Sequence, residues 1–270
     1  MRKPLCAVLT ASVLGILPLE TKAQNATWYI STYTDEMLVW DEDSETIIDR
    51  IEMNRIIPNG VQLNESKTHL YVGDGSAEYI QVVDIAAREV VDEYSLSEGD
   101  TTFRIGAFAP HPSEPKAIVF GRRHTKMVDR YSVEGPFILE YDLSKKVVTD
   151  TVPWPDGEER DRVSFRYSPD GATLYFFTND IIAVDSETYE EIDRWEISNP
   201  LEPGLGRPTF STASQTYDEP GLATNLMRMR DPVHNRTLMG IASVRLSEKE
   251  VDFYTVGPSE PVSAFAMAPD

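Results

Sequence analysis

Apolar and polar positions alternate along most of this chain in short runs that are typical of half-buried β-strands. One phrase recurs, in which a β-rich run ends in aspartate, a short polar stretch follows, and a second β-rich run contains another aspartate. The first runs of its five copies are Leu38–Asp41, Gln81–Asp84, Leu139–Asp142, Ile182–Asp185 and the degenerate Ala242–Arg245. Each copy is predicted to form a hairpin, because the aspartate carboxylate at the strand end can accept backbone N–H bonds that close the turn.

A second turn signal precedes several copies, at Asn64–Lys67, His111–Glu114 and Ser168–Gly171, and a further β-rich run follows each one. Two turns per repeat, with a strand before the first and after the second, make four strands per repeat. Four-stranded units that recur at this spacing are the blades of a propeller. The sequence therefore predicts an all-β protein, a β-propeller of four-stranded blades with five blade units visible.

The spacing of the strand ends indicates insertions in two repeats. Asp41 and Asp84 are 43 positions apart, as are Asp142 and Asp185, whereas the other two intervals are 58 and 60 positions. The additional residues are predicted to be long loops at 121–136, 199–207 and 230–236. In a propeller these connections share one face of the disc, and long loops on a rigid scaffold commonly bind ligands or partners.

The residues of these repeats resemble known propeller proteins. The turn Ser168–Gly171, the aromatic run after it and Val184–Asp185 are similar to the YVTN-type repeat. More narrowly, Ile105–Pro110 and Arg162–Phe165, with the long segment up to Tyr141–Asp142, resemble the propeller (beta) subunit of quinohemoprotein amine dehydrogenase and amine dehydrogenase heavy-chain-like proteins. This resemblance spans residues 28–270. It implies a subunit that binds no cofactor itself, shapes the access of an amine substrate and docks a partner subunit that holds a quinone cofactor.

The N-terminal segment has the pattern of a cleaved signal peptide. Arg2 and Lys3 precede an apolar run from Leu5 to Leu19, and small or polar residues follow it. The run is shorter than the roughly 18–20 residues that span a bilayer. We therefore expect residues 1–23 to be a signal peptide, residues 24–270 to form the propeller domain, and the mature protein to be periplasmic or secreted. Cys6 is the only cysteine, so removal of the signal would leave a chain without disulfides.

The chain is strongly acidic, with 25 lysines and arginines against 45 aspartates and glutamates and a net charge of −20. Such a charge disfavours binding to nucleic acid or to an anionic membrane surface, and it favours cationic amines. The predicted loops nevertheless collect basic residues. The binding-face candidates are Arg122, Arg123, His124, Lys126, Asp129, Arg130, Arg207, Arg230, His234 and Arg236. These side chains either bind an acidic partner or anionic ligand, or pair with the abundant carboxylates and hold the loops in place.

No catalytic constellation is recognisable in the sequence. The four histidines have no metal-ligand spacing, and neither a nucleophile elbow nor a phosphate-binding glycine loop is present. We expect no metal and no cofactor to be bound by this chain. Two hypotheses remain, a subunit of an exported amine-dehydrogenase-like complex and a stand-alone propeller that binds a protein or small ligand without catalysis.

The two ends of the chain leave the number of blades open. Residues 261–270 have the pattern of a first strand and the start of its turn, whereas the chain from Trp28 opens with a second strand that no first strand precedes. The C-terminal strand could complete the N-terminal blade and close a five-bladed ring. Alternatively, the chain is a truncated seven-bladed propeller, which the resemblance to the dehydrogenase subunits favours.

Overall fold

The computed structural model describes residues 26–178, 180–197, 209–215 and 221–258, and these form antiparallel sheets of successive strands. The first sheet contains β1 (Thr27–Ser31), β2 (Glu36–Asp41) and β3 (Thr46–Glu52). The second contains β4 (Asn59–Leu63), β5 (His69–Gly73), β6 (Tyr79–Asp84) and β7 (Glu89–Ser95). The third contains β8 (Thr101–Pro110), β9 (Lys116–Lys126), β10 (Tyr131–Asp142) and β11 (Val147–Thr151).

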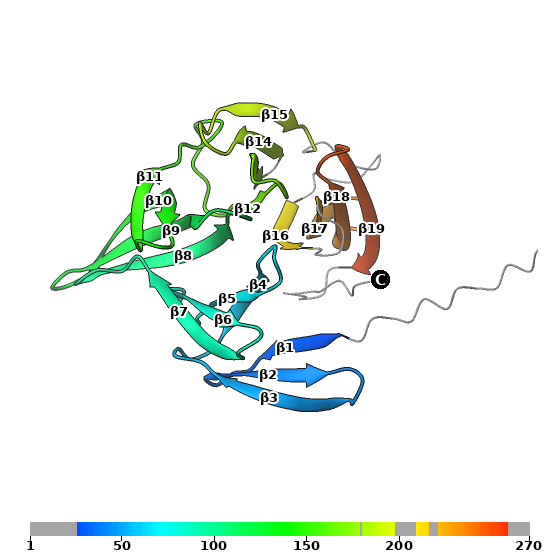
Figure 1. The fold of residues 1–270 in the computed structure, drawn as a ribbon. Helices are drawn as coiled ribbons and strands as arrows, with labels where there is room; N and C mark the ends of the chain where they lie inside the picture. The colour runs from blue at the N-terminus through cyan, green and yellow to red at the C-terminus, as the bar shows by residue number, and fades with distance from the viewer. Residues whose placement is uncertain (1–25, 179, 198–208, 216–220, 259–270) are drawn as a thin grey trace, which may run out of the picture.

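The last two sheets repeat this four-stranded order. The fourth contains β12 (Ser164–Tyr167), β13 (Thr173–Phe177), β14 (Ile181–Asp185) and β15 (Glu191–Trp195). The fifth contains β16 (Thr209–Gln215), β17 (Leu222–Asp231), β18 (Arg236–Arg245) and β19 (Glu250–Pro258). Figure 1 shows the sheets arranged around a centre, with β4, β12 and β16 near the middle and β11, β15 and β19 on the outside. The predicted propeller of antiparallel blades is confirmed.

The strand-ending aspartates close the hairpins between the third and fourth strands, as the repeated phrase predicts. Oδ2 of Asp41 accepts the Ser44 N–H at 2.9 Å, and Oδ1 of Asp84 accepts the Ala87 N–H at 2.8 Å. Asp142 and Asp185 each accept two backbone N–H groups in the same way. In all five sheets the residue four positions after the strand end has a positive φ of 51–59°; these left-handed turn residues are Glu45, Arg88, Lys146, Tyr189 and Lys249.

The inner strands bury apolar side chains on both faces, and the resulting cores hold each sheet against its neighbours. On the central strands of the fourth sheet, Phe176 and Ile182 belong to a core shared with the third sheet, whereas Phe177 and Ile181 belong to a core shared with the fifth. Similar cores join the first sheet to the second and the second to the third. Because both faces are buried, β14 is the near-continuous apolar run Ile181–Val184, whereas β11 on the outside is exposed along its whole length.

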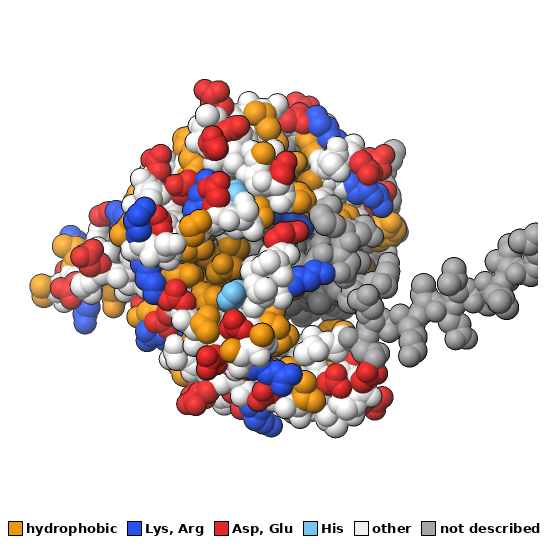
Figure 2. All heavy atoms as spheres, viewed as in Figure 1, with side chains coloured by type: hydrophobic (Ala, Val, Ile, Leu, Met, Phe, Trp, Pro, Cys, Tyr) orange, Lys and Arg blue, Asp and Glu red, His pale blue; other side chains and the backbone are white. Residues whose placement is uncertain are grey.

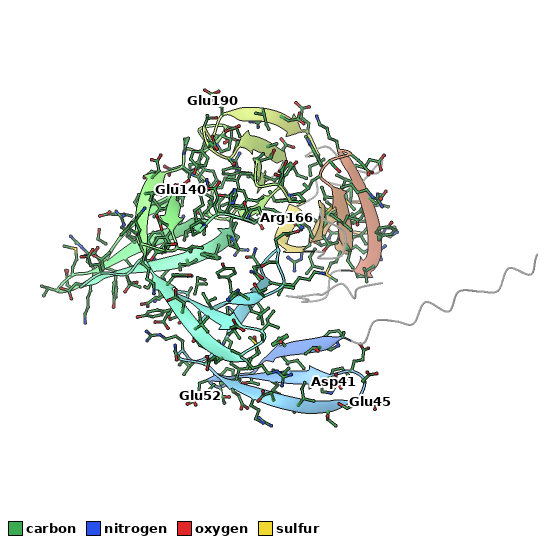
Figure 3. All side chains as sticks on the ribbon, in the orientation of Figure 1. Asp41, Glu45, Glu52, Glu140, Arg166 and Glu190 are labelled. Atoms are coloured by element: carbon green, nitrogen blue, oxygen red, sulfur yellow. The ribbon has the colours of Figure 1, made fainter. Side chains whose placement is uncertain are left out.

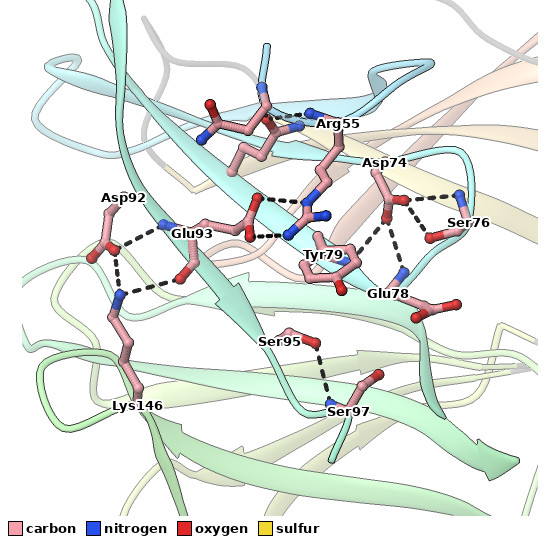
Figure 4. Close-up of polar contacts among 12 residues, drawn as sticks. Arg55, Asp74, Ser76, Glu78, Tyr79, Asp92, Glu93, Ser95, Ser97 and Lys146 are labelled. Carbon is pink, nitrogen blue, oxygen red and sulfur yellow. Dashed lines mark hydrogen bonds and ion pairs between the residues drawn. The ribbon is translucent and has the colours of Figure 1, made fainter. Parts of the chain in front are cut away.

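A polar contact accompanies every apolar junction between the described sheets. Arg88 donates to Asp49 of the first sheet at 3.2 Å, and Lys146 donates to Asp92 of the second sheet at 2.5 Å, as Figure 4 shows. The Tyr189 hydroxyl donates to Glu140 of the third sheet at 2.6 Å. Lys249 pairs with Asp193 of the fourth sheet. In each junction the left-handed turn residue of the later sheet donates to a carboxylate of the earlier sheet. In three junctions this carboxylate is the second aspartate of the repeated phrase, whereas Tyr189 uses Glu140 on β10.

The predicted insertions lie where expected, but residues 121–136 are not a loop. They continue β9 and β10 as paired strands, with Thr125 opposite Ser132 and His124 opposite Val133, and a register shift follows Glu134. In such a hairpin the backbone groups that face the partner strand pair across the ladder, so extending the strands satisfies more of them than a loop would. Residues 230–236 likewise form the ends of β17 and β18 and the turn between them, whereas 199–207 lie outside the described residues.

The first sheet has three strands, and its order corresponds to the second, third and fourth strands of the others, as the sequence predicts. In Figure 1 the first and fifth sheets are the two ends of the arc. Among the described strands, no sheet and no buried cluster joins these two ends. Residues 1–25 and 259–270 lie outside the description, so the signal peptide and the C-terminal strand remain predictions.

Gln81 supports the connection between the first two sheets, and its replacement by leucine should be costly. The side chain is fully buried on β6, and its Oε1 accepts the N–H groups of Asn54 at 2.7 Å and Arg55 at 3.1 Å. Gln81→Leu leaves both donors without this acceptor and should lower the free energy of unfolding by about 2 kcal/mol. Urea denaturation measures this change. Gln62→Leu on β4 is the control, and a loss of equal size in both variants would contradict the role of Gln81.

Candidate functional site

The β9–β10 hairpin carries most of the candidate binding residues. Its tip lies at the left in Figure 1, away from the centre of the arc of sheets. The extension is backed by β8, whose Thr101 lies opposite Thr125. Several large apolar side chains near the tip are exposed; they are Met127, Val128, Tyr131 and Val133. Val128 is fully exposed and Tyr131 is 62% exposed. Sequence reasoning identified the basic residues of this hairpin and missed its apolar ones, although the run of β-compatible residues to Val133 was a usable signal.

The basic side chains of the hairpin differ in their contacts. Arg122 is paired with Asp161 at 2.5 Å, so this residue fits the interpretation in which arginines hold the insertion in place. The Arg123 guanidinium lies 4.9 Å from the centre of the Phe137 ring. Lys126 and Arg130 form no ion pair within the part of the chain that the structure describes. The hairpin therefore presents two cations next to exposed apolar side chains, in a protein of net charge −20.

The second basic group surrounds Asp231 at the end of β17. Arg236 binds this carboxylate at 3.1 Å and His234 at 2.8 Å, while Arg230 donates to Asn235. Burial raises the pKa of Asp231, but the hydrogen bonds from His234 and Arg236 outweigh it and lower the pKa to about 2. These residues are engaged within their own turn, as the ion-pair interpretation predicts.

The candidates do not form one patch through any contact between described residues. Figure 1 shows β17 and β18 on the right of the arc of sheets, with the β9–β10 tip on the left. His124 lies on β9 opposite Thr102 and Val133, and Asp129 lies in the turn at the tip. Arg207 lies outside the described residues. The hairpin therefore stands as a separate surface, consisting of residues 122–134.

A hollow of about 390 Å³, including space open to solvent, lies among the inner strands. The ends of β4, β8 and β12 and the turns that follow them line it, with Asn64, His111, Arg166 and Tyr167 among the lining residues. Figure 3 places Arg166 near the centre of the arc of sheets, and Figure 2 shows apolar side chains in the middle of the visible face. Sequence reasoning missed this hollow, because its lining residues come from three repeats.

Tyr167 is the least satisfied polar group of this hollow. The residue is buried, and its hydroxyl has no hydrogen-bond partner within the described residues. Burial also raises its pKa far above the usual value, so the hydroxyl is protonated and can donate. A buried hydroxyl without a partner is costly unless a ligand or water completes it.

His111 has a structural role beside Tyr167. Its Nδ1 accepts the N–H groups of Glu114 at 3.0 Å and Ser113 at 3.3 Å, so the proton of the neutral ring is on Nε2, 3.2 Å from the Gly171 carbonyl oxygen. The ring also meets Tyr167 edge-on, with centroids 4.7 Å apart. Burial is the main reason that the pKa of His111 is lowered. The histidine thus closes the turn after β8 in its neutral form.

Within the described residues, no group of three or more His, Cys, Asp or Glu side chains could hold a metal ion. Asp156, from the most acidic segment of the sequence, is bound by the Arg160 guanidinium. No helix in the described part of the chain is long and apolar enough to cross a membrane.

Comparison with known proteins identifies the fold and no family. No protein-family model matches the chain, and no sequence match is found among curated proteins. Solved structures do match, 958 chains in all, as expected for a widespread fold. Hydrazine synthase from Kuenenia stuttgartiensis aligns with a TM-score of 0.51 at 11% identity, over 82% of this chain and 60% of that chain. At this identity the likeness is one of fold alone.

Fold and comparison together define the class, an all-β protein built of propeller blades. More particularly, it is a propeller with an extended hairpin on its third blade and a small hollow among its inner strands.

The neutral His111 should make stability fall as pH decreases through the mildly acidic range. An unfolded histidine has a pKa of about 6.5 and takes up a proton that the folded ring resists, so the native state loses stability below that pH. His111→Asn should flatten this dependence between pH 7 and 5, because asparagine does not titrate. The turn should be kept, since an asparagine oxygen can replace the Nδ1 acceptor, as Asn64 does in the turn after β4. Denaturant unfolding at several pH values measures it. His124→Asn is the control, and an unchanged pH dependence in His111→Asn would contradict the assignment.

Proposed function

We propose that this chain is a non-catalytic propeller subunit that docks a protein partner through the β9–β10 hairpin. The observation that carries this proposal is the pair of cations, Lys126 and Arg130, that have no described carboxylate partner and stand beside exposed Met127, Val128 and Tyr131. An exposed apolar cluster with neighbouring charges is the usual composition of an interface, with apolar anchors at the centre and polar groups at the rim.

The charge distribution selects the kind of partner. Most of the surface repels acidic proteins, because the chain carries a net charge of −20. The tip of the hairpin is an exception, because Lys126 and Arg130 outnumber Asp129 there. A partner with an acidic patch is therefore attracted to the tip and repelled by the rest of the surface. Electrostatic complementarity of this kind chiefly sets the association rate and the orientation of a complex.

The hairpin is also well suited to docking because it is ordered before the partner arrives. Its two strands pair from the body of the sheet to Lys126 and Tyr131, and β8 supports the pairing as far as Thr125. Ordering a loop on binding opposes association, whereas a preformed strand pair avoids most of that cost. The additional residues of the third blade therefore extend a rigid element.

We place this subunit in an exported complex of the amine-dehydrogenase kind. Two sequence features support this assignment, the signal-like residues 1–23 and the resemblance of Ile105–Pro110 and Arg162–Phe165 to the propeller subunit of such enzymes. In that complex the partner holds the quinone cofactor, and the acidic surface of this chain favours the approach of cationic amines.

A stand-alone propeller that binds a small ligand is the second candidate. The hollow lined by Arg166 and Tyr167 favours it, because the buried Tyr167 hydroxyl has no described partner and could donate to a ligand oxygen. The two candidates use different surfaces, so variants can separate them.

Reversal of the two tip charges should weaken partner binding. We expect Lys126→Glu combined with Arg130→Glu to lower the affinity for the captured partner about tenfold or more, since like charges then meet across the interface. The partner is captured from an extract of the source cells on the immobilised chain, identified by mass spectrometry, and its affinity is measured by biolayer interferometry.

The matched control is Lys67→Glu with Lys145→Glu, which makes the same charge change on turns away from the hairpin. Circular dichroism checks that both double variants fold. Equal affinity of the hairpin variant and the control would contradict docking through the hairpin. Loss of partner binding in Tyr167→Phe, with none in the hairpin variant, would also contradict docking through the hairpin and would move the contact to the hollow.

A further inference from the structure

The outward face of the first sheet is apolar and has no described neighbour. On β1 and β2, Tyr29, Met37 and Val39 face the core shared with the second sheet, so the alternate residues point the other way. Those residues are Trp28, Ile30, Leu38 and Trp40. Trp28 is 42% exposed, and its ring lies edge-on to Trp40 with centroids 6.4 Å apart. Such a face is suited to pack against a further sheet, as both faces of the second, third and fourth sheets do.

The left-handed turn residue of each sheet contacts the sheet that precedes it in the arc, so its chemistry selects that neighbour. In the four described junctions, Arg88, Lys146, Tyr189 and Lys249 each donate to a carboxylate of the preceding sheet. Glu45 is the corresponding residue of the first sheet, with φ of 51°. An ionised glutamate accepts hydrogen bonds and donates none. The first sheet therefore reverses the polarity of the contact that the other four sheets share.

The fifth sheet presents the wrong charge for Glu45. Three of the acceptor carboxylates occupy the same register position, opposite the residue that lies two positions before the strand-ending aspartate; they are Asp49, Asp92 and Asp193. In the fifth sheet Asp252 occupies this position, opposite Ser243. Because Ala242 and Val244 face the fourth sheet, Ser243 and Asp252 face away from it. Arg245 is close by but is already surrounded by carboxylates, those of Glu248, Glu250 and Asp252. At its rim, the side of the fifth sheet that faces away from the fourth sheet thus has an excess of negative charge where Glu45 would arrive.

We propose that the outward face of the first sheet receives a partner sheet of blade geometry whose outer strand presents lysine or arginine to Glu45, and that it rejects the fifth sheet of this chain, in the same molecule or in a second copy. The apolar side chains of the first sheet supply the area that packs against the partner. The negative charge of Glu45, where the other sheets have a donor, selects a partner that presents a cation. A like-charge contact at the rim of an interface excludes a wrong partner even when the apolar surfaces match.

Charge reversal at the two positions tests this proposal with the full chain. Wild type should not associate through this face. Glu45→Lys restores the donor that the other sheets have and should pair with the carboxylates of the fifth sheet. Asp252→Lys supplies the required cation from the other side, opposite wild-type Glu45. We therefore expect either single variant to bring the first and fifth sheets together, and the double variant, which again opposes like charges, to behave as wild type.

Two measurements detect the contact. Sedimentation velocity at low salt reports association of two copies, and reduced acrylamide quenching of tryptophan reports burial of Trp28, including by closure within one molecule. Asp43→Lys makes the same charge change in the same turn, at a residue without positive φ, and should match wild type. Self-association of wild type through Trp28 would overturn the proposal. It would also be overturned if Glu45→Lys behaved like Asp43→Lys.

Discussion

The burial of both faces of each inner strand is the constraint on which the rest of this structure depends. Ile181 and Ile182 are adjacent in sequence, yet they belong to cores on opposite sides of the same sheet. A sheet with two apolar faces cannot be stable alone, so it must pack between two neighbours. Repetition of this requirement around a centre produces the arc of blades. It also leaves the outer strands and the hairpins as the positions where residues can change without disturbing a core.

Polar contacts refine this packing at its rim. The exposed ion pairs between sheets are individually weak, so they contribute little to the free energy of folding. Their common geometry has a different effect, because a donor on the later sheet always meets a carboxylate on the earlier one, as Arg88 and Asp49 illustrate. Such contacts distinguish correct neighbours from incorrect ones. The same distinction between packing area and charge applies at the β9–β10 hairpin, where Val128 and Tyr131 supply area and Lys126 and Arg130 supply selectivity.

The repeated phrase predicted the blades, the hairpins and the three strands of the first sheet among the described residues, because alternation and turn-closing aspartates are local properties of the sequence. It did not predict that residues 121–136 extend β9 and β10, since a length excess alone does not distinguish a loop from longer strands. Nor did it reveal the hollow around Tyr167, whose lining comes from three separate repeats. Whether an arginine forms an ion pair, as Arg122 does with Asp161, depends on residues distant in sequence. The sequence therefore identified the basic candidates without showing which of them are free to bind a partner.

The left-handed turn residues have a consequence for how such a chain can change over evolution. The second, third and fourth repeats each carry both halves of their junctions, a donor in the turn and a carboxylate acceptor that meets the next sheet. A duplicated repeat therefore arrives with contacts that already suit its new neighbours, and a repeat can be gained or lost without simultaneous changes in two others. Tyr189, which donates through a hydroxyl where its counterparts are cations, shows that the pattern tolerates drift as long as a donor remains. The number of repeats can thus change more easily than the donor–acceptor chemistry of the junctions between sheets.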